Sequence, residues 1–326
     1  MAERSIRVRV PGTSANLGAG FDTLGLACNL YNELELTLTH DPGLTFDIQG
    51  EGAGRIPEDE RNIVWRSIRL LLERAHRDRE YRGAVIKMKN DVPLSRGLGS
   101  SAAAIVAGLK GANALIGNPF NRREILHLAT EIEGHPDNVA PAIFGGCTIS
   151  TVKGRHVDTF AFFPRMRLHF VVAVPDFYLP TKKAREVLPE SVPRADAIFN
   201  IGRVALLVAA LMKGSVPFLR HALDDVLHQP YRAKLIPGMY DVFRAAREAG
   251  ALGTVLSGAG PCLLAFTIDG EHREAAIGRA MQQAFAAHDV KADIKVLGLD
   301  TKGAHIINER PHMHESEGAK SHGGLH

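Results

Sequence analysis

The chain has 326 residues, a formal net charge of +3 and a hydrophobic fraction of 45%. This composition is that of a soluble globular protein long enough for two domains, and a charge so small and so evenly spread argues against a nucleic-acid surface. The three cysteines form no C-x-x-C pair, and MAERSIRVRV has no apolar signal core. We therefore expect a cytoplasmic protein with reduced thiols. The longest apolar runs, such as RVALLVAALM, are taken as too short to cross a bilayer.

The first predicted strand comes before a loop rich in polar residues. Apolar residues alternate with arginines in IRVRV, and PGTSANLGAGFDTLG follows. Burying polar groups such as Asn16 and Asp22 in a loop destabilises the fold unless these groups have hydrogen-bond partners. A turn-rich connection and a binding loop are both open interpretations. Further strands are expected in NELELTLT and LTFDIQG, and a helix over residues 63–76.

The segment NDVPLSRGLGSSAAA, residues 90–104, connects a predicted strand with a predicted alanine-rich helix. Gly97 and Gly99 then lie in the turn, and Ser100 and Ser101 lie in the first helical turn. Unpaired N–H groups and the helix dipole favour an anion at such a position.

Three interpretations of this segment are open: a glycine turn with a serine cap, a dinucleotide fingerprint, or a nucleotide loop of another kind. The dinucleotide fingerprint requires an acid about twenty residues later, where Asn118-Pro119-Phe120 stands. The lysine-bearing P-loop is excluded because the segment has no G-K-S/T.

A dense group of ionisable residues follows a predicted helix over residues 123–133. Glu133, His135, Asp137 and Asn138 lie within six residues of EIEGHPDNVAPAIFGG. A structural turn does not need this density, so the pattern favours function. Zinc is the weaker alternative, because there is one histidine and no cysteine.

From LHFVVAVP onward, strands and helices start again, which predicts an α+β domain with helices on one face of its sheet. The stretches TKKAREVLP and YRAKLIPG are solvated faces unless their arginines bind a carboxylate. GTVLSGAGPCLLAF fits a tight hairpin or a second backbone approach to phosphate. The predicted helices cover residues 201–212, 218–227, 239–248 and 271–287, and the predicted strands are GTVLSG, CLLAFT and DIKVLG.

Together these stretches resemble the GHMP kinases. Pro93 to Ala103 match the family motif P-x-x-x-G-L-G-S-S-A-A, and Gly253 to Pro261 resembles its C-terminal glycine motif. PGTSANLGAGFDTLG, EGHPDNVAPAIFGG, TKKAREVLP and YRAKLIPG are similar to the homoserine kinase branch in particular. Mevalonate-type members have P-S-G-x-D-N where this chain has HPDN.

The resemblance implies a two-domain α+β fold. Residues 1–160 are expected to form an S5-like α/β domain with a left-handed βαβ unit that binds ATP, and residues 161–310 a ferredoxin-like α+β domain. The polar, histidine-rich tail 311–326 is expected to be disordered.

The resemblance also implies a reaction, the phosphorylation of L-homoserine by ATP to O-phospho-L-homoserine in threonine biosynthesis, with Mg²⁺. Such a reaction relies on positioning and charge stabilisation. Another small-alcohol kinase of the same fold, or a non-catalytic relative that binds a metabolite, are the alternatives. A homodimer remains open as the state of assembly.

Site residues are carried over from the family by their positions in these motifs. Asn138, Asp137 and Arg185 are the catalytic candidates, with the γ-phosphate itself as the other acceptor for the hydroxyl proton. Mg²⁺ is assigned to Ser100 and Glu133, with Glu131 as the rival. The acceptor amino acid is assigned to Asn16, Asp22, His135, Thr181, Arg185 and Arg232. ATP is assigned to Asn62, Val64, Trp65, Pro93, Leu94, Ser95, Arg96, Gly97, Leu98, Gly99, Ser100, Ser101, Ala102 and Ala103.

Overall fold

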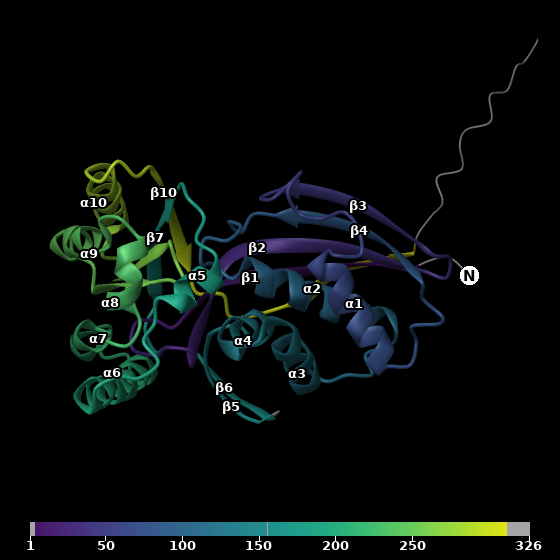
Figure 1. Ribbon diagram of the computed structural model, residues 1–326, viewed down its shortest axis with the longest axis horizontal. Helices are drawn as coiled ribbons and strands as arrows, with labels where there is room; N and C mark the ends of the chain where they lie inside the picture. Colours follow the sequence, from purple (N-terminus) through teal and green to yellow (C-terminus); the bar gives the residue numbers. More distant parts are fainter. Residues whose placement is uncertain (1–3, 155, 312–326) are drawn as a thin grey trace, which may run out of the picture.

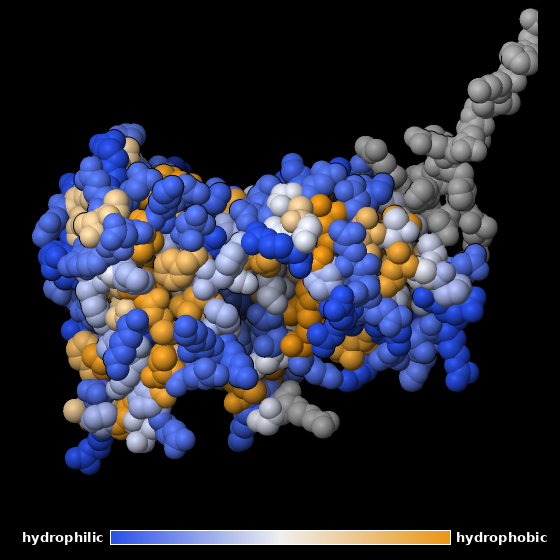
Figure 2. Space-filling view, turned by 45° about the horizontal axis from the view of Figure 1, so that its top comes forward, coloured by the Kyte–Doolittle hydropathy of each residue, from blue (hydrophilic) through white to orange (hydrophobic). Residues whose placement is uncertain are grey.

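The computed structural model describes residues 4–154 and 156–311. Two α+β halves lie along the long axis of the molecule, with the short helix α5 (Thr181–Glu186) between them (Figure 1). The surface is notched where the halves meet (Figure 2). The predicted two-part mixed fold is confirmed, whereas the expected division at residue 160 stays a prediction.

The first half is a seven-stranded sheet covered by four helices. The strands pair in the order β11-β1-β2-β4-β3, with β5 joined to β2 and β6 joined to β5. The pair β3 and β4 is parallel, and the others are antiparallel. The strands are β1 (Arg4–Ala15), β2 (Leu24–Thr39), β3 (Gly43–Gly50), β4 (Gly83–Asn90), β5 (Cys147–Lys153), β6 (His156–Phe162) and β11 (His305–Pro311).

The alternation of residues in β1 decides which face of this sheet is buried. Ile6 and Val8 point into the core, while Arg7 and Arg9 reach outward to the carboxylate of Glu33 on β2. The buried face packs against helices whose alanines and leucines face the sheet. These helices are α1 (Ile63–Arg74), α2 (Ser100–Leu115), α3 (Arg122–Glu133) and α4 (Pro136–Phe144).

The second half contains an antiparallel sheet with the order β10-β7-β9-β8. Its strands are β7 (Leu168–Pro175), β8 (Gly253–Leu256), β9 (Leu263–Ile268) and β10 (Ala292–Gly298). Its helices, besides α5, are α6 (Arg194–Lys213), α7 (Val216–Ala222), α8 (Gln229–Arg232), α9 (Met239–Glu248) and α10 (Glu274–Ala286), and residues 233–235 add one 3₁₀ turn.

Helices cover both faces of this second sheet, so the prediction of helices on one face is wrong. Phe170 and Val172 of β7 pack with apolar residues of α6 and α7. Val171 and Ala173, on the opposite face, pack with α9 and α10. The β7 residues are almost all apolar, and a strand buried on both faces reads as a continuous apolar run.

Several element bounds also differ from the prediction. Strand β1 continues through Pro11 to Ala15, so the expected loop begins only at Asn16. Helix α6 starts at Arg194 and includes RVALLVAALM; among the described residues it alone is long and apolar enough, by length and composition, to cross a membrane. Its Leu207 and Leu211 are buried in the protein core. Helix α7 ends at Ala222, five residues before the expected end of a helix there.

Strand pairing connects the two ends of the chain, and a shared core cluster connects its two halves. Strand β11 pairs with β1, so residues 305–311 belong to the first sheet. The core cluster under α6 also contains Leu17 and Leu98 from the first half. The three cysteines are free and buried, as expected, and burial raises the pKa of each thiol. Of the tail 311–326 that is predicted to be disordered, Pro311 ends β11, and residues 312–326 lie outside the described residues.

Candidate functional site

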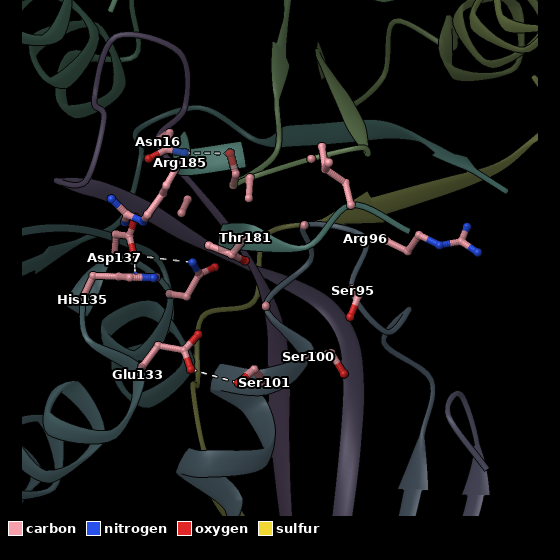
Figure 3. A pocket seen from close by; sticks show the side chains of 18 of the residues that line it. Asn16, Ser95, Arg96, Ser100, Ser101, Glu133, His135, Asp137, Thr181 and Arg185 are labelled. Atoms are coloured by element: carbon pink, nitrogen blue, oxygen red, sulfur yellow. Dashed lines mark hydrogen bonds and ion pairs between the residues drawn. The ribbon is translucent and has the colours of Figure 1, made fainter. Parts of the chain in front are cut away.

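A cavity of about 150 Å³ lies at the junction of the two halves. Six segments line it: the turn after β1, the glycine loop before α2, the α3–α4 junction, helix α5 with the residues before it, the end of α8, and the loop between β8 and β9 (Figure 3). Of the predicted site residues, those in its lining are Asn16, Asp22, Leu94, Ser95, Arg96, Gly97, Gly99, Ser100, Ser101, Glu133, His135, Asp137, Asn138, Thr181, Arg185 and Arg232.

The glycines of the central loop are required by close backbone packing. A Cβ atom on Gly97 would lie 2.2 Å from the carbonyl oxygen of Ser257, and one on Gly99 would lie 2.0 Å from Oγ1 of Thr13. Both glycines have positive φ, 86° and 66°. The Ser257 hydroxyl donates to the Gly97 carbonyl at 2.6 Å, so the β8–β9 loop holds the central loop from behind.

The start of α2 lacks the side-chain cap that α1 and α3 have, as do the starts of α4 and α5. Asn62 caps α1 and Asn121 caps α3 with their side chains, whereas Gly99 is the N-cap of α2 and no side chain caps it. The serine cap, one of the three open interpretations of this segment, is therefore not formed. The first N–H groups of α2 have no intrahelical partner, and they lie beside the cavity, where an anion can bind them.

Glu133 is a partly buried carboxylate next to this helix start. Ser101 donates a hydrogen bond to its Oε2 at 2.9 Å (Figure 3), and burial raises the pKa of Glu133. Its rival Glu131 pairs with Arg74 at 2.8 Å on the surface and does not line the cavity. The geometry therefore favours Glu133 over Glu131 as a metal ligand.

A chain of hydrogen bonds continues along the first turn of α4. Nδ1 of His135 lies 2.5 Å from Oδ1 of Asp137, and Asn138 accepts a hydrogen bond from Thr13 at 2.8 Å. Burial lowers the pKa of His135, but the hydrogen bond and charge of Asp137, with the charge of Glu133, outweigh it and raise that pKa. Asp137 is only 2% exposed, yet it lines the cavity.

Asp22 and Arg185, both predicted to bind the acceptor, form an ion pair at the cavity. Arg185 donates two hydrogen bonds to Asp22, at 2.9 and 3.0 Å, and each side chain is nearly 40% exposed. Asn16 holds the turn in place, because it donates to the Gly258 carbonyl and accepts from the Asp22 N–H. Thr181 begins α5, one helical turn before Arg185, and also lines the cavity.

Arg232 lines the same side but is only 2% exposed. Its Nε donates to the Ala184 carbonyl, and its Nη1 donates to the Gly258 carbonyl and to Nδ1 of His228. Burial, with the Arg185 charge, lowers the pKa of Arg232 to about 10, so the guanidinium stays charged at neutral pH. Its Nη2 has no hydrogen-bond partner within the described part of the chain.

Not every predicted ATP residue faces the cavity. Asn62 is fully buried, with its amide bonded to the Pro57 carbonyl and the Val64 N–H, and Val64 and Trp65 belong to the first core. Their assignment to adenine therefore stays a prediction without support from the cavity. Pro93 lines a neighbouring hollow. The buried side chains of Leu98, Ala102 and Ala103 hold the loop from within.

Sequence reasoning missed the residues that support the site from behind. Ser257 and Thr13 bond to the glycine loop and to α4, and His228 bonds to Arg232. The buried polar groups of the turn after β1 find their partners in the second half of the chain, which no local pattern reveals. Over the described ranges, no group of three or more His, Cys, Asp or Glu side chains could hold a metal ion by itself.

Comparisons with known proteins agree with this geometry. Residues 62–146 match the GHMP kinases N terminal domain and residues 207–287 match the GHMP kinases C terminal domain. The chain is 46% identical over 300 residues to a homoserine kinase of Moorella thermoacetica, covering 92% of this chain and 99% of that one. The corresponding protein of Carboxydothermus hydrogenoformans is 43% identical over 297 residues, covering 91% and 95%.

Solved structures give the same picture. A homoserine kinase of Cytophaga hutchinsonii superimposes with a TM-score of 0.85 at 35% identity, covering 93% of this chain and 97% of that one. A mevalonate kinase of L. major superimposes with a TM-score of 0.71 at 19% identity, covering 90% and 95%, and shares the fold.

Proposed function

The chain belongs to the GHMP kinases, within their homoserine kinase branch, and we propose how its cavity divides among ATP, Mg²⁺ and the acceptor. It is an ATP-dependent kinase that acts on an alcohol, and the branch identifies that alcohol as L-homoserine. The products are O-phospho-L-homoserine and ADP. The observation that carries the division is that one cavity joins an uncapped helix start, a partly buried carboxylate and a separate pair of charged side chains.

The triphosphate of ATP binds at the start of α2 in this proposal. Gly97 and Gly99 leave room for backbone N–H groups to approach phosphate oxygens, and the dipole of the 16-residue helix favours the negative charge. No lysine is needed, because the N–H groups and the metal carry the stabilisation.

Mg²⁺ fits the donors beside this loop. Magnesium prefers oxygen ligands, takes one or two carboxylates, and keeps waters and phosphates in its remaining positions. Glu133 offers one carboxylate and Ser100 a hydroxyl at the cavity wall, while Ser101 orients Glu133 through its hydrogen bond. When bound, the ion supplies positive charge that neutralises the transferring phosphoryl group.

The acceptor binds on the opposite side of the cavity. Its α-ammonium replaces Arg185 as the partner of Asp22, and its α-carboxylate takes Arg185 and Arg232 as donors. The ion pair between Asp22 and Arg185 thus exchanges partners when a zwitterion enters. Asn16, Thr181 and His135 complete the walls around the amino acid.

Asp137 and Asn138 lie between the two subsites and bound the position of the reacting hydroxyl. In the transfer, the hydroxyl oxygen forms a bond to the γ-phosphorus, and the bond from that phosphorus to the bridging oxygen of ADP breaks. The hydroxyl proton goes to Asp137 or to the phosphoryl oxygens. Asp137 already accepts from His135, which holds its carboxylate in place.

One assay tests the acceptor. Release of ADP is measured by a coupled enzyme assay with homoserine, serine, threonine, mevalonate and galactose side by side. We expect homoserine to give the highest kcat/KM. A higher kcat/KM for mevalonate or galactose would contradict homoserine as the acceptor. Absence of turnover with all five compounds would contradict the kinase activity.

A matched pair of variants tests the metal ligand. Glu133→Gln removes the cavity carboxylate, and Glu131→Gln removes an equally sized carboxylate two residues away on the surface. Metal charge stabilisation is worth several kcal/mol, so Glu133→Gln should lower kcat by roughly 100-fold or more and raise the Mg²⁺ needed for half activity. Glu131→Gln should stay within about twofold of the unchanged protein, as surface changes usually do. The opposite ranking would show that the assignment is shifted by two residues.

We also propose that the protein is a cytoplasmic homodimer. Helix α6 exposes Ile198 and Ile201, which are 63% and 66% exposed, and Phe218 on α7 is 56% exposed. Exposed apolar groups of this kind favour association. Light scattering at micromolar concentration measures the mass, and a 35.3 kDa species would contradict the dimer.

A further inference from the structure

His228 is a fully buried histidine that touches both sides of the acceptor subsite. It lies directly before α8 and is 0% exposed. Its Nε2 is 2.9 Å from the carbonyl oxygen of Gly18, in the turn that carries Asp22. Its Nδ1 is 3.2 Å from Nη1 of Arg232. One imidazole therefore connects the turn with the buried arginine.

The two partners determine the protonation state of this ring. The Gly18 carbonyl can only accept, so Nε2 must carry the hydrogen. The Arg232 guanidinium can only donate, so Nδ1 must offer its lone pair. Burial lowers the pKa of His228; the charge of Asp225 opposes this, the Arg232 charge adds to it, and the pKa falls to about 4, which agrees with a neutral ring. The fold thus selects the neutral Nε2–H tautomer.

Other contacts fix the ring in this place. Asp225 accepts from the backbone N–H groups of His228 and Gln229 and from the side chain of Asn200, which rigidifies the segment before α8. Asp225 also lies 3.5 Å from Nε2 of His228, and its own side chain is fully buried. Among the described residues, Arg232 is the cationic side chain that contacts the ring.

An aromatic ring completes the connection. Phe21, in the same turn as Gly18, stacks on the His228 ring with centroids 4.9 Å apart and an interplanar angle of 18°. The Arg232 guanidinium lies 5.1 Å from the Phe21 centroid on its face. The turn also packs closely, since a Cβ atom on Gly18 would lie 2.2 Å from the Leu223 carbonyl oxygen. Movement of His228 would therefore displace the turn and Arg232 together.

We propose that His228 is a positioning residue for the amino-acid acceptor. It sets the separation between Arg232, which takes the α-carboxylate, and the turn carrying Asp22, which takes the α-ammonium. A neutral ring is needed for this task because a protonated one has no lone pair for Arg232. The inference rests on the proposed function, because it assumes that both charges read an amino acid.

The test uses two variants that each keep one of the two links. His228→Gln can still donate to Gly18 from its terminal amide, and His228→Asn can still offer an oxygen to Arg232. Hydrogen bonds to charged groups are strong enough that losing the Arg232 link in His228→Gln should lower kcat/KM for homoserine by roughly 10- to 100-fold. Most of that loss should lie in KM, and the KM for ATP should stay within about twofold. His228→Asn should recover part of it.

Homoserinol and Arg232→Leu separate positioning from general damage. Homoserinol has no carboxylate, so His228→Gln should change its kcat/KM by less than about threefold, as expected for an interaction that substrate does not make. In the Arg232→Leu background, His228→Gln should lower kcat/KM for homoserine little further, because the effects of coupled residues are not additive. Equal losses on both acceptors, or fully additive losses, would overturn the proposal.

Thermal melting shows whether the variants fold. If they do not, nitrogen NMR of the unmodified protein still tests the proposal. The His228 ring should show the Nε2–H tautomer at neutral pH, and its shifts should respond to homoserine more than to homoserinol. A protonated ring or the other tautomer would overturn it. Failure of the proposed function looks different: the unmodified protein would then not phosphorylate homoserine at all.

Discussion

Asp22→Asn should convert the preference of the site from a zwitterion toward a simple carboxylate. The change removes the negative charge that pairs with Arg185 at 2.9 and 3.0 Å and that the proposal assigns to the α-ammonium. The two acceptors to compare are homoserine and 4-hydroxybutanoate, which is homoserine without its ammonium. Asparagine keeps the shape, so the turn around it should survive.

The exposure of the pair sets the magnitudes. Both side chains are nearly 40% exposed, so opening the pair costs only about 0.2–1 kcal/mol. Loss of a hydrogen-bonded charge partner in a bound complex typically costs about 2–5 kcal/mol. Asp22→Asn should therefore lower kcat/KM for homoserine by roughly 30- to 4,000-fold, at about 1.36 kcal/mol per factor of ten. For 4-hydroxybutanoate it should leave kcat/KM unchanged or raise it by up to about fivefold, because Arg185 no longer has to leave a partner.

Steady-state kinetics with both acceptors at saturating ATP measure this difference. Asp269→Asn is the matched control, because that carboxylate pairs with Arg167 and is 41% exposed, against 38% for Asp22, but lies outside the cavity. The control variant should leave kcat/KM unchanged for both acceptors. If Asp22→Asn lowers kcat/KM equally for both acceptors, Asp22 does not bind the ammonium, and the proposed exchange of ion-pair partners is wrong.

Two further predictions concern the phosphate side. Gly99→Ala should weaken ATP binding measured by calorimetry, because its Cβ would meet Thr13 at 2.0 Å; Gly117→Ala carries the same positive-φ strain with nothing within 4 Å, and should bind ATP normally. Burial raises the pKa of Glu133, so the folded state holds this proton more tightly than the unfolded chain, and that contribution to stability is lost as pH rises through the raised pKa. Without Mg²⁺, Glu133→Gln should therefore melt at the same or a higher temperature than the unchanged protein near neutral pH. The difference in melting temperature between the two proteins should disappear as the pH is lowered. A lower melting temperature for Glu133→Gln at neutral pH would contradict the burial argument.

Local patterns in the sequence predicted most helices and strands, because apolar spacing reports which side of an element is buried. They placed α1, α3 and α9 to within two residues at each end. They failed where a strand is buried on both faces, as β7 is, since no polar face then shows which side the helices cover. They also failed at β11, whose partner β1 lies at the other end of the chain.

The same limit applies to the site. Motifs brought Glu133, Asp137 and Arg185 to attention because charged residues between apolar flanks need a reason. His228 gave no such signal, because it is one polar residue in an ordinary setting whose partner lies far away in the sequence. Ser257 lies in a stretch that the sequence did single out, but its bond to the glycine loop, 160 residues away, was not predicted. Contacts that support a site from behind are long-range, so a single sequence does not reveal them.

The return of β11 to β1 has a consequence for how the protein is made. During synthesis the edge of β1 stays without this partner until residues 305–311 emerge, more than 280 residues after β1 itself is complete. An unpaired strand edge is a template for pairing with other chains. Early termination of translation should therefore yield fragments that aggregate, even when every residue of the first half is present. The nascent chain should depend on chaperones until its end is released.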